Sequence, residues 1–527
     1  MNFTDKLISF VSPEKALKRA EARERLKVFN HFGGGSGYGR HGASYAKKSL
    51  LSWFTDSRNA DDDIIENLEE LRARSRDLFM SGGFATGALK TIRTNVVGSG
   101  LMLSALPDFD YLGMTEEEAA KWRKNTEREF KIWAESVNCD AERKQNFYQL
   151  QSLVILSALM SGDVFAVMPY IKRPGVLYDL RVGLIEADRV CDPLNKDPNK
   201  NIFGGVETGE YNEVIAYYIA KNHPGATPRN TDVKQEWKRV LAFGQTTGRR
   251  NVLHIMCDVE RPAQRRGVPI LAPVIEDLKQ LTRYKDAELM AAVISAMFTI
   301  FIKSESKQEP FQNIFPGEME ADKKDPNSYE MGNGAIVSLE PGESIETANP
   351  GRPNTAFDAF VMAICRQIGS ALELPYELLI KHFSTSYSAS RGALLEAWKM
   401  FKMRREWLTA NFCQPVYEEW LTEAVLKGRI EAPGFLTDPA RRAAWANAEW
   451  FGDAQGQLNP LDEAKAAEVR VNAGFSTRDR EASELTGMKY EQIHAVRKRE
   501  EEMRRRDGLA PEAAVWQNQF GTGVKNE

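Results

Sequence analysis

The chain has 527 residues, with 70 lysines and arginines against 74 aspartates and glutamates, so its formal net charge is -4. Apolar residues make up 42% and charged residues 27%, which is typical of globular proteins and excludes a disordered chain. The charge balance excludes a generally basic protein that coats nucleic acid. At about 150 residues per domain, the length predicts three or four domains.

The longest strongly apolar run, residues 289–302, has 14 residues. This is fewer than the ~20 that span a bilayer, so the run predicts a core or interface segment and we expect no membrane. The N-terminus lacks the apolar core of a secretion signal. The five cysteines are widely spaced without a CxxC pair, which predicts buried free thiols rather than a disulfide framework.

The first half of the chain predicts an arm and a mixed domain. Residues 33–39 contain five glycines, which favour no regular element, so we expect residues 1–59 to form a mobile arm. Three aspartates at residues 61–63 suit the start of a helix. A second, apolar helix over residues 146–162 leads into strand-like runs separated by Pro, Asn, Asp and Gly. Residues 60–265 therefore predict a mixed α+β domain.

The second half predicts long helices around an acidic insert. A helical stretch within residues 266–302 follows two prolines, and another helix covers residues 354–374. The insert between them is rich in proline, and residues 303–346 carry ten acids and four bases, a net charge of -6. A polar loop at residues 375–390 precedes a long helix over 391–428, in which Pro415 predicts a kink.

The fold class predicted by these elements is α+β, mainly helical. Residues 429–527 continue as charged helices.

The motifs in the chain do not combine into a catalytic site. Residues 37–42 match GxGxxG, but no strand precedes them, and residues 42–49 resemble a P-loop that lacks its second glycine. No HExxH or GxSxG motif occurs, and the six histidines are widely separated. His254 lies in an apolar, strand-like run, which favours a hydrogen-bonded core histidine. We therefore predict no enzyme activity, no metal and no cofactor.

An elongated pair of long helices leaves apolar faces that one chain cannot cover by itself. Identical copies arranged head to tail in a closed ring would bury them. The pattern of helices therefore predicts a cyclic oligomer.

Nine segments carry a resemblance that extends from about residue 72 to residue 509. They are RARSRDLFMSGGFATGALKTIRTNVVGSGL, DVFAVMPY, LRVGLIEADRV, GGVETGEYNEVIAYYI, VLHIM, QRRGVPILAPVIEDLKQLTRYKDAELMAA, SRGALLEAW, WFGDAQGQLNPLDEAKAAEVRVNAGFSTRDREASELTG and YEQIHAVRKREEEM. Each is weak by itself, but their order and spacing are specific. In this series the chain resembles the portal proteins of lambda-type tailed phages, the head-tail connectors.

The resemblance implies a portal fold, with an α/β wing, a long-helix stem, a small α/β clip and a helical crown. The implied parts are an N-terminal arm at 1–59, the wing at 60–265, a stem helix at 266–302, the clip at 303–353, a second stem helix at 354–374, the tunnel loop at 375–390, the long helix at 391–428 and the crown and C-terminal helical region at 429–527.

The resemblance also implies a twelve-subunit ring at one capsid vertex, through which double-stranded DNA is packaged and ejected. The partners that it implies are the terminase large subunit, head-tail connector or neck proteins, and the major capsid and scaffold proteins. The implied locations are the virion and, during assembly, the host cytoplasm.

A channel for sliding DNA should not bind it tightly, because phosphate contacts would add drag. The polar tunnel loop supplies side chains that contact a DNA backbone without reading bases. An ordinary flexible loop is the alternative. The basic run Lys399, Lys402, Arg404 and Arg405 either approaches DNA or pairs with a neighbour's acids. The residues predicted to approach DNA are Lys381, His382, Ser384, Thr385, Ser386 and Tyr387.

The acidic clip predicts a docking surface for the packaging motor and, later, for neck proteins, with Glu318, Glu320 and Asp322 as the test residues. Two alternatives remain at this stage. One is a monomeric, capsid-associated scaffold or structural protein, and the other is an enzyme of unknown type.

Overall fold

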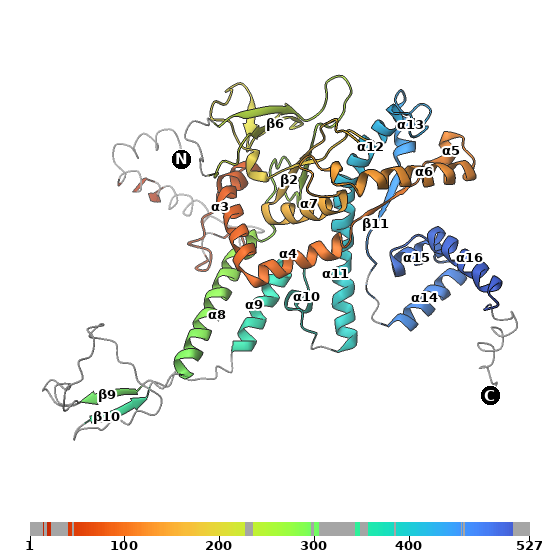
Figure 1. Cartoon of the computed structure of the whole chain (residues 1–527). Coiled ribbons are helices and arrows are strands. Elements are labelled where there is room, and N and C mark those ends of the chain that lie inside the picture. The colour runs from red at the N-terminus through yellow and green to blue at the C-terminus, as the bar shows by residue number, and fades with distance from the viewer. Residues whose placement is uncertain are drawn as a thin grey trace, which may run out of the picture. The chain divides into compact units, whose positions relative to one another are not determined.

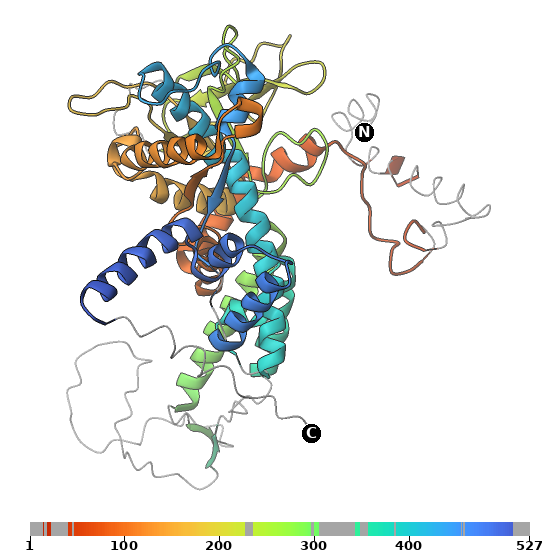
Figure 2. The same cartoon turned by 90° about the vertical axis from the view of Figure 1, so that its right-hand side faces the viewer.

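The computed structural model (Figures 1 and 2) divides the chain into two compact units, Met1–Asp63 and Ile64–Glu527. It describes residues 41–44, 47–226, 235–296, 300–304, 343–347, 357–383, 386–454, 456 and 459–509, together with Glu14, Lys18, Arg19, Glu21 and Ala22. Most of the segment predicted as a clip and most of residues 1–40 therefore lie outside the described residues.

Helices make up most of the described structure, which confirms the mainly helical α+β class. The α-helices are α3 Ala60–Ser81, α4 Gly83–Val96, α5 Phe109–Leu112, α6 Glu116–Ala134, α7 Phe147–Ser161, α8 Ile275–Ala296, α9 Phe357–Ala371, α10 Tyr376–Ile380, α11 Tyr387–Leu408, α12 Gln414–Leu426, α13 Pro439–Ala446, α14 Pro460–Asn472, α15 Arg478–Thr486 and α16 Tyr490–Arg506. Short 3-10 turns lie at η2 Val137–Cys139, η3 Ala187–Arg189 and η4 Ala272–Val274.

Within the described ranges the strands form four small sheets, in the orders β3-β2-β8, β4-β5-β6-β7, β1-β11 and β10-β9, and all of their ladders are antiparallel. Their bounds are β1 Met102–Ala105, β2 Asp163–Val167, β3 Gly183–Ile185, β4 Asn201–Phe203, β5 Val206–Thr208, β6 Val214–Ala220, β7 Trp237–Leu241, β8 Val252–Met256, β9 Ile300–Ser304, β10 Glu343–Thr347 and β11 Ala448–Phe451.

The apolar helix predicted over residues 146–162 is α7. Asn146 and Gln149 form a reciprocal capping box at its start, which satisfies backbone N–H groups that would otherwise lack partners. The helix ends at Gly162, whose φ of 89° favours glycine. A Cβ at Gly162 would meet the backbone of Gly267 at 2.3 Å, so these two glycines permit a close approach of two chain segments just before β2.

An aromatic cluster joins segments that are far apart in the sequence. Phe130 of α6 makes edge-to-face contacts with Phe147 of α7 and with Tyr417 and Trp420 of α12, at centroid distances of 5.8, 5.7 and 5.1 Å. All four side chains are almost fully buried. Each buried aromatic contributes roughly 2 to 3 kcal/mol of transfer free energy, so this cluster fixes α6 and α7 against α12.

Helices α8 and α9 pack antiparallel (Figure 1). Tyr284, in the middle of α8, lies 5.5 Å from Phe357 and 5.0 Å from Phe360 at the start of α9, measured between ring centroids. Near the other end, Gln367 of α9 donates to Asp277 of α8 at 3.2 Å. The helix predicted within residues 266–302 is α8, which has 22 residues and is about 33 Å long. It ends at Ala296, and the apolar residues 300–302, which the pattern assigned to the helix, belong to β9 instead.

The predicted loop at residues 375–390 is only partly a loop. Helix α10 occupies Tyr376–Ile380 and α11 already begins at Tyr387. Pro375 is compatible with the start of α10 because the N–H of the first helical residues needs no helical acceptor. The irregular segment is therefore shorter than the sequence pattern indicates.

A short π-helix, η5 Thr409–Cys413, joins α11 to α12. Pro415 stands in the first turn of α12, where its missing N–H disrupts the regular helical hydrogen bonding. The regular α-helical hydrogen bonding therefore changes to a π-helix directly before Pro415, and the kink predicted at Pro415 stays a prediction.

Four of the cysteines are buried and Cys191 is partly buried, and all five are free, as the spacing predicts. Among the described residues, no helix is long and apolar enough to cross a membrane.

Candidate channel and docking surfaces

A fully buried carboxylate opens β2. Asp163 accepts hydrogen bonds from Arg72 of α3, from Arg266, from His254 of β8 and from the backbone N–H of Gly267, at 2.7 to 3.2 Å. Burial by itself would raise the pKa of this carboxyl, but the two guanidinium groups hold it well below its usual range. We call Asp163, Arg72, Arg266 and His254 the Asp163 cluster.

His254 is the core histidine that its apolar context predicts. Its ring stacks on Phe165 at a centroid distance of 4.2 Å, and its Nε2 lies 3.2 Å from Asp163. Burial lowers the pKa of His254, and the hydrogen bond to Asp163 only partly offsets this effect. The histidine is therefore neutral at pH 7 and donates to Asp163, which is a structural role.

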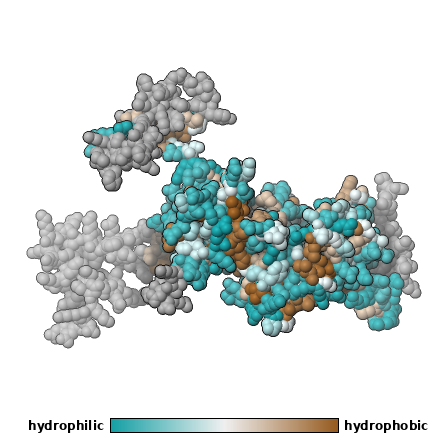
Figure 3. Space-filling view, turned by 90° about the horizontal axis from the view of Figure 1, so that it is seen from above, coloured by the Kyte–Doolittle hydropathy of each residue, from teal (hydrophilic) through white to brown (hydrophobic). Residues whose placement is uncertain are grey.

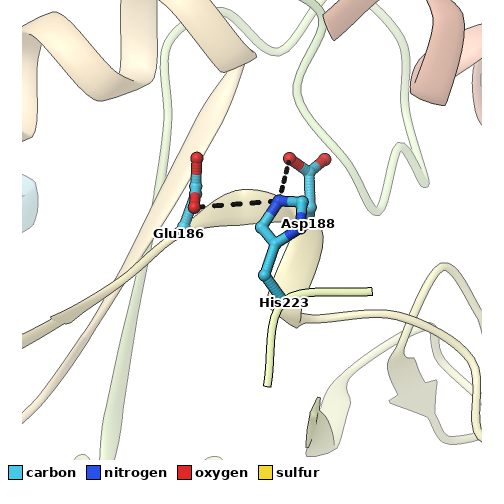
Figure 4. A group of neighbouring side chains, drawn as sticks. All are labelled: Glu186, Asp188 and His223. Atoms are coloured by element: carbon cyan, nitrogen blue, oxygen red, sulfur yellow. Dashed lines mark hydrogen bonds and ion pairs between the residues drawn. The ribbon is translucent and has the colours of Figure 1, made fainter. Parts of the chain in front are cut away.

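A second ionic group lies beside this cluster (Figure 4). His223 Nε2 is 3.3 Å from Asp188 and 3.8 Å from Glu186. These three residue types can bind a metal ion, and their ligand atoms lie within 4.8 Å of one another. However, Arg76 pairs with both carboxylates and Arg72 lies 3.6 Å from Asp188. The two guanidinium groups already neutralise the carboxylates, so this group joins α3 to η3 rather than forming a cation site.

Two buried glutamates of α12 bind the segment that connects β2 to β3. Glu419 accepts from the hydroxyl of Tyr170 at 2.5 Å and pairs with Arg249 at 2.6 Å. Glu423 accepts from the backbone N–H groups of Asp179 and Leu180. These charged side chains of the long-helix region therefore form contacts within the subunit.

The loop predicted to approach DNA is partly described. Lys381 ends α10 in the left-handed conformation, with φ of 56°, and His382 follows it; both side chains are exposed. The hydroxyl of Ser386 accepts from the N–H of Ala389 and caps α11. Ser384, Thr385 and the side chain of Tyr387 lie outside the described residues.

The basic run on α11 separates into two pairs. Arg404 is buried and contacts Asp258 at 3.4 Å and Glu373 at 3.6 Å. Arg405 donates to three backbone carbonyls, those of Val96, Asn95 and Asp453.

The other two members of the run, Lys399 and Lys402, are exposed, and Lys399 pairs with Glu396 one turn away. Arg404 and Arg405 both have partners within the same subunit, which the sequence pattern did not indicate.

Large apolar side chains remain exposed on the long helices. Leu289 and Met290 of α8 are 64% and 61% exposed, and Leu395 and Met403 of α11 are also exposed. Hydrophobic patches separated by hydrophilic surface are also visible on the face shown in Figure 3. Large contiguous apolar patches are typical of interaction surfaces.

The acidic residues predicted for docking, Glu318, Glu320 and Asp322, lie outside the described residues. The sequence patterns did not predict the Asp163 cluster. A usable signal was present, because Asp163 stands between a helix-ending glycine and a strongly apolar strand, where a charged residue requires a partner.

Residues 46–405 match the family model described as phage portal protein, lambda family. The chain therefore belongs to the lambda family of phage portal proteins, as its segments indicated.

Two relatives match nearly the whole chain. Portal protein B of Escherichia phage lambda is 26% identical over 504 residues, which cover 92% of this chain and 91% of the relative. The portal protein of Escherichia phage N15 is 27% identical over 521 residues, which cover 94% of both.

Among solved structures, a chain in the neck of an empty GTA particle matches with 12% identity and a TM-score of 0.44, covering 83% of this chain and 98% of that chain. A chain in the virion of a native gene transfer agent particle matches with 14% identity and a TM-score of 0.42, covering 79% and 92%.

Proposed function

We propose that this portal-family chain forms a ring at one capsid vertex, through which double-stranded DNA is packaged and ejected. The observation that carries this proposal is the family match over residues 46–405. The exposed apolar side chains of α8 and α11 support it, because a closed ring of identical copies would cover them. We propose twelve subunits, the number that the family resemblance implies.

The test is the native mass of the purified chain, combined with end-on views by electron microscopy. Rings with an open centre and about twelve subunits support the proposal. A stable monomer that stays monomeric when shell and scaffold proteins are added contradicts it and favours the alternative of a monomeric structural protein. Steady ATP hydrolysis by the pure protein would favour the other alternative, an enzyme.

Within the ring, α8 and α9 would be the stem and residues 303–353 the clip, with the crown in the C-terminal helices. Residues 381–387 would face the channel and contact the DNA backbone weakly, through Lys381, His382, Ser384, Thr385, Ser386 and Tyr387. Replacing Lys381 and His382 by glutamate should alter packaging without loss of rings. Packaging equal to that of the unchanged protein would contradict the channel role.

The clip would dock the terminase large subunit during filling and neck proteins afterwards. Glu318, Glu320 and Asp322 supply acidic charge for this contact, and complementary charge mainly speeds association and sets orientation. Replacing all three by lysine should weaken motor docking at low salt. Unchanged docking at low salt would remove the electrostatic part of the proposal.

We propose that the protein is a non-enzymatic component of the virion that assembles in the host cytoplasm beside major capsid and scaffold proteins. Its role requires no cofactor, because the work of moving DNA is supplied by the separate motor.

A further inference from the structure

Helix α6 presents three faces with different tasks. One face is buried and carries Trp122, Phe130 and Trp133. A second face contacts the C-terminal helices, because Arg123 pairs with Glu491 at 2.8 Å and Glu127 pairs with Lys489 at 2.6 Å. The third face carries exposed cations and lies beside an open groove.

We call this groove of about 1010 Å³ the basic groove. The turn between α5 and α6, the third face of α6, the segment after α12 and the start of α13 form its walls. The side chains that define it are Leu112, Met114, Glu118, Lys121, Trp122, Lys124, Arg128, Arg429, Glu431, Arg441 and Trp445.

The floor of the basic groove is apolar and preformed. Trp122 and Trp445 pack with ring centroids 4.9 Å apart, and Leu112 and Met114 lie beside them. The indole N–H groups donate to the carbonyls of Glu431 and Pro433, at 2.9 and 3.3 Å. Trp122 and Trp445 are only 9% and 4% exposed, so the floor offers an occupant a small area of these rings beside the partly exposed side chains of Leu112 and Met114.

The rim of the groove is positive. Five cations and two carboxylates line it, which gives a net charge of +3, although the whole chain has -4. Counting Glu129, which pairs with Arg429 at 2.6 Å, still leaves +2. The carboxylate of Glu118 already accepts hydrogen bonds from the N–H and the hydroxyl of Thr115 in the capping box of α6.

Three of the cations lie along one line of α6. Lys121, Lys124 and Arg128 follow the i, i+3, i+7 spacing, so they share a face over about 10 Å. All three are exposed; Arg128 donates to Asn125 and is close enough to Glu129 to help lower the pKa of that carboxyl. An extended peptide rises about 3.3 Å per residue, so the line matches roughly three peptide residues.

We propose that the basic groove binds an acidic segment of a partner protein, in which aspartates or glutamates flank a large apolar side chain. The carboxylates pair with the line of cations on α6, and the apolar side chain contacts Leu112, Met114 and the small exposed part of the tryptophan floor. A DNA duplex would meet the exposed cations but would leave the apolar floor unused. This proposal does not require the ring or the channel, because every residue of the groove belongs to one subunit.

The test is fluorescence anisotropy with the purified full-length protein and a short labelled peptide that has a central leucine-phenylalanine pair between acidic residues. The double variant Lys121→Glu/Lys124→Glu should bind about tenfold more weakly, because each reversal replaces attraction by repulsion. The matched control is Lys131→Glu/Lys172→Glu, which makes the same change at exposed lysines outside the groove. The control should keep the affinity of the unchanged protein.

A second probe has serines in place of the apolar pair. It should bind to the unchanged protein more weakly than the first probe does, because serine buries no apolar surface on the floor of the groove. Equal binding of both probes, or equal binding by the double variant and the control, would overturn the proposal. Tighter binding of a short DNA duplex, lost in the double variant, would assign the groove to nucleic acid instead. Changed native mass in the double variant alone would assign it to contacts between copies.

Discussion

The Asp163 cluster buries a charged side chain, whereas the long helices expose apolar side chains. In the cluster, a fully buried carboxylate is satisfied entirely by residues of its own subunit. On α8, Leu289 and Met290 are exposed, although they belong to the most apolar run of the sequence. The comparison separates residues that hold one subunit together from residues that are available to another molecule.

The largest effect on subunit stability is expected at the cluster. Asp163→Asn removes the carboxylate that pairs with both buried guanidinium groups and leaves Arg72 only its 3.6 Å contact with Asp188, which should lower the free energy of unfolding by about 3 to 5 kcal/mol. Urea denaturation followed by circular dichroism measures the change. The control is Glu135→Gln, which removes an exposed pair with Lys131 and should cost less than about 0.5 kcal/mol. Similar values for both variants would contradict the comparison.

The basic run on α11 allows buried and exposed charged residues to be compared within one helix. Arg404→Ala removes a buried side chain that contacts Asp258 and Glu373, and should cost about 2 kcal/mol. Lys402→Ala, two residues earlier and exposed, should change the free energy of unfolding by no more than about 0.5 kcal/mol. The same denaturation experiment measures both, and a reversed order would show that burial does not decide the role of this run.

A smaller, pH-dependent effect is expected from His254. Because burial lowers its pKa in the folded state, the unfolded chain takes up the proton first as the pH falls below about 6.5. The contribution of His254 to stability is therefore present above that pH and is lost as the pH falls toward the folded pKa. His254→Gln keeps a donor for Asp163 but cannot titrate, so its stability should fall less steeply between pH 6.5 and pH 5.

Thermal unfolding of the unchanged protein and of His254→Gln across this pH range measures the difference in slope. The carboxyl of Asp163 contributes to the loss of stability only below about pH 5, where the unfolded chain begins to protonate this group, and the loss continues down to the pKa of Asp163 in the folded state, which is held well below its usual range. Parallel pH profiles for the two proteins would contradict the assignment of a neutral buried histidine.

The smallest effect on subunit stability is expected on the exposed face. Leu289→Glu should leave the free energy of unfolding within about 0.5 kcal/mol, because the side chain is 64% exposed. If this face packs against another copy, the same variant should abolish rings in native mass measurements. The matched control is Leu194→Glu, at an exposed position between β3 and β4. Rings that persist in Leu289→Glu would remove α8 from the proposed interface.

Sequence patterns predicted the helices with strong local signals. The start of α7 is encoded by Asn146 and Gln149, and its end by Gly162. The apolar environment of His254 also predicted a core histidine. Boundaries were less predictable where helices continue into polar segments: α10 and the first turn of α11 occupy most of a stretch whose composition is typical of a loop.

The sequence by itself determined the mainly helical α+β class and the membership of the portal family. Both follow from local patterns and from the order of matching segments along the chain, and neither requires knowledge of which residues are in contact. Only the tertiary structure decided which charges are internal. Arg404 and Lys402 look alike in a basic run, and Asp163 and Glu135 both follow a stretch rich in apolar residues. Their difference depends on partners distant in sequence, such as Asp258 for Arg404 and Arg266 for Asp163, and long-range pairing follows from the packing of the chain.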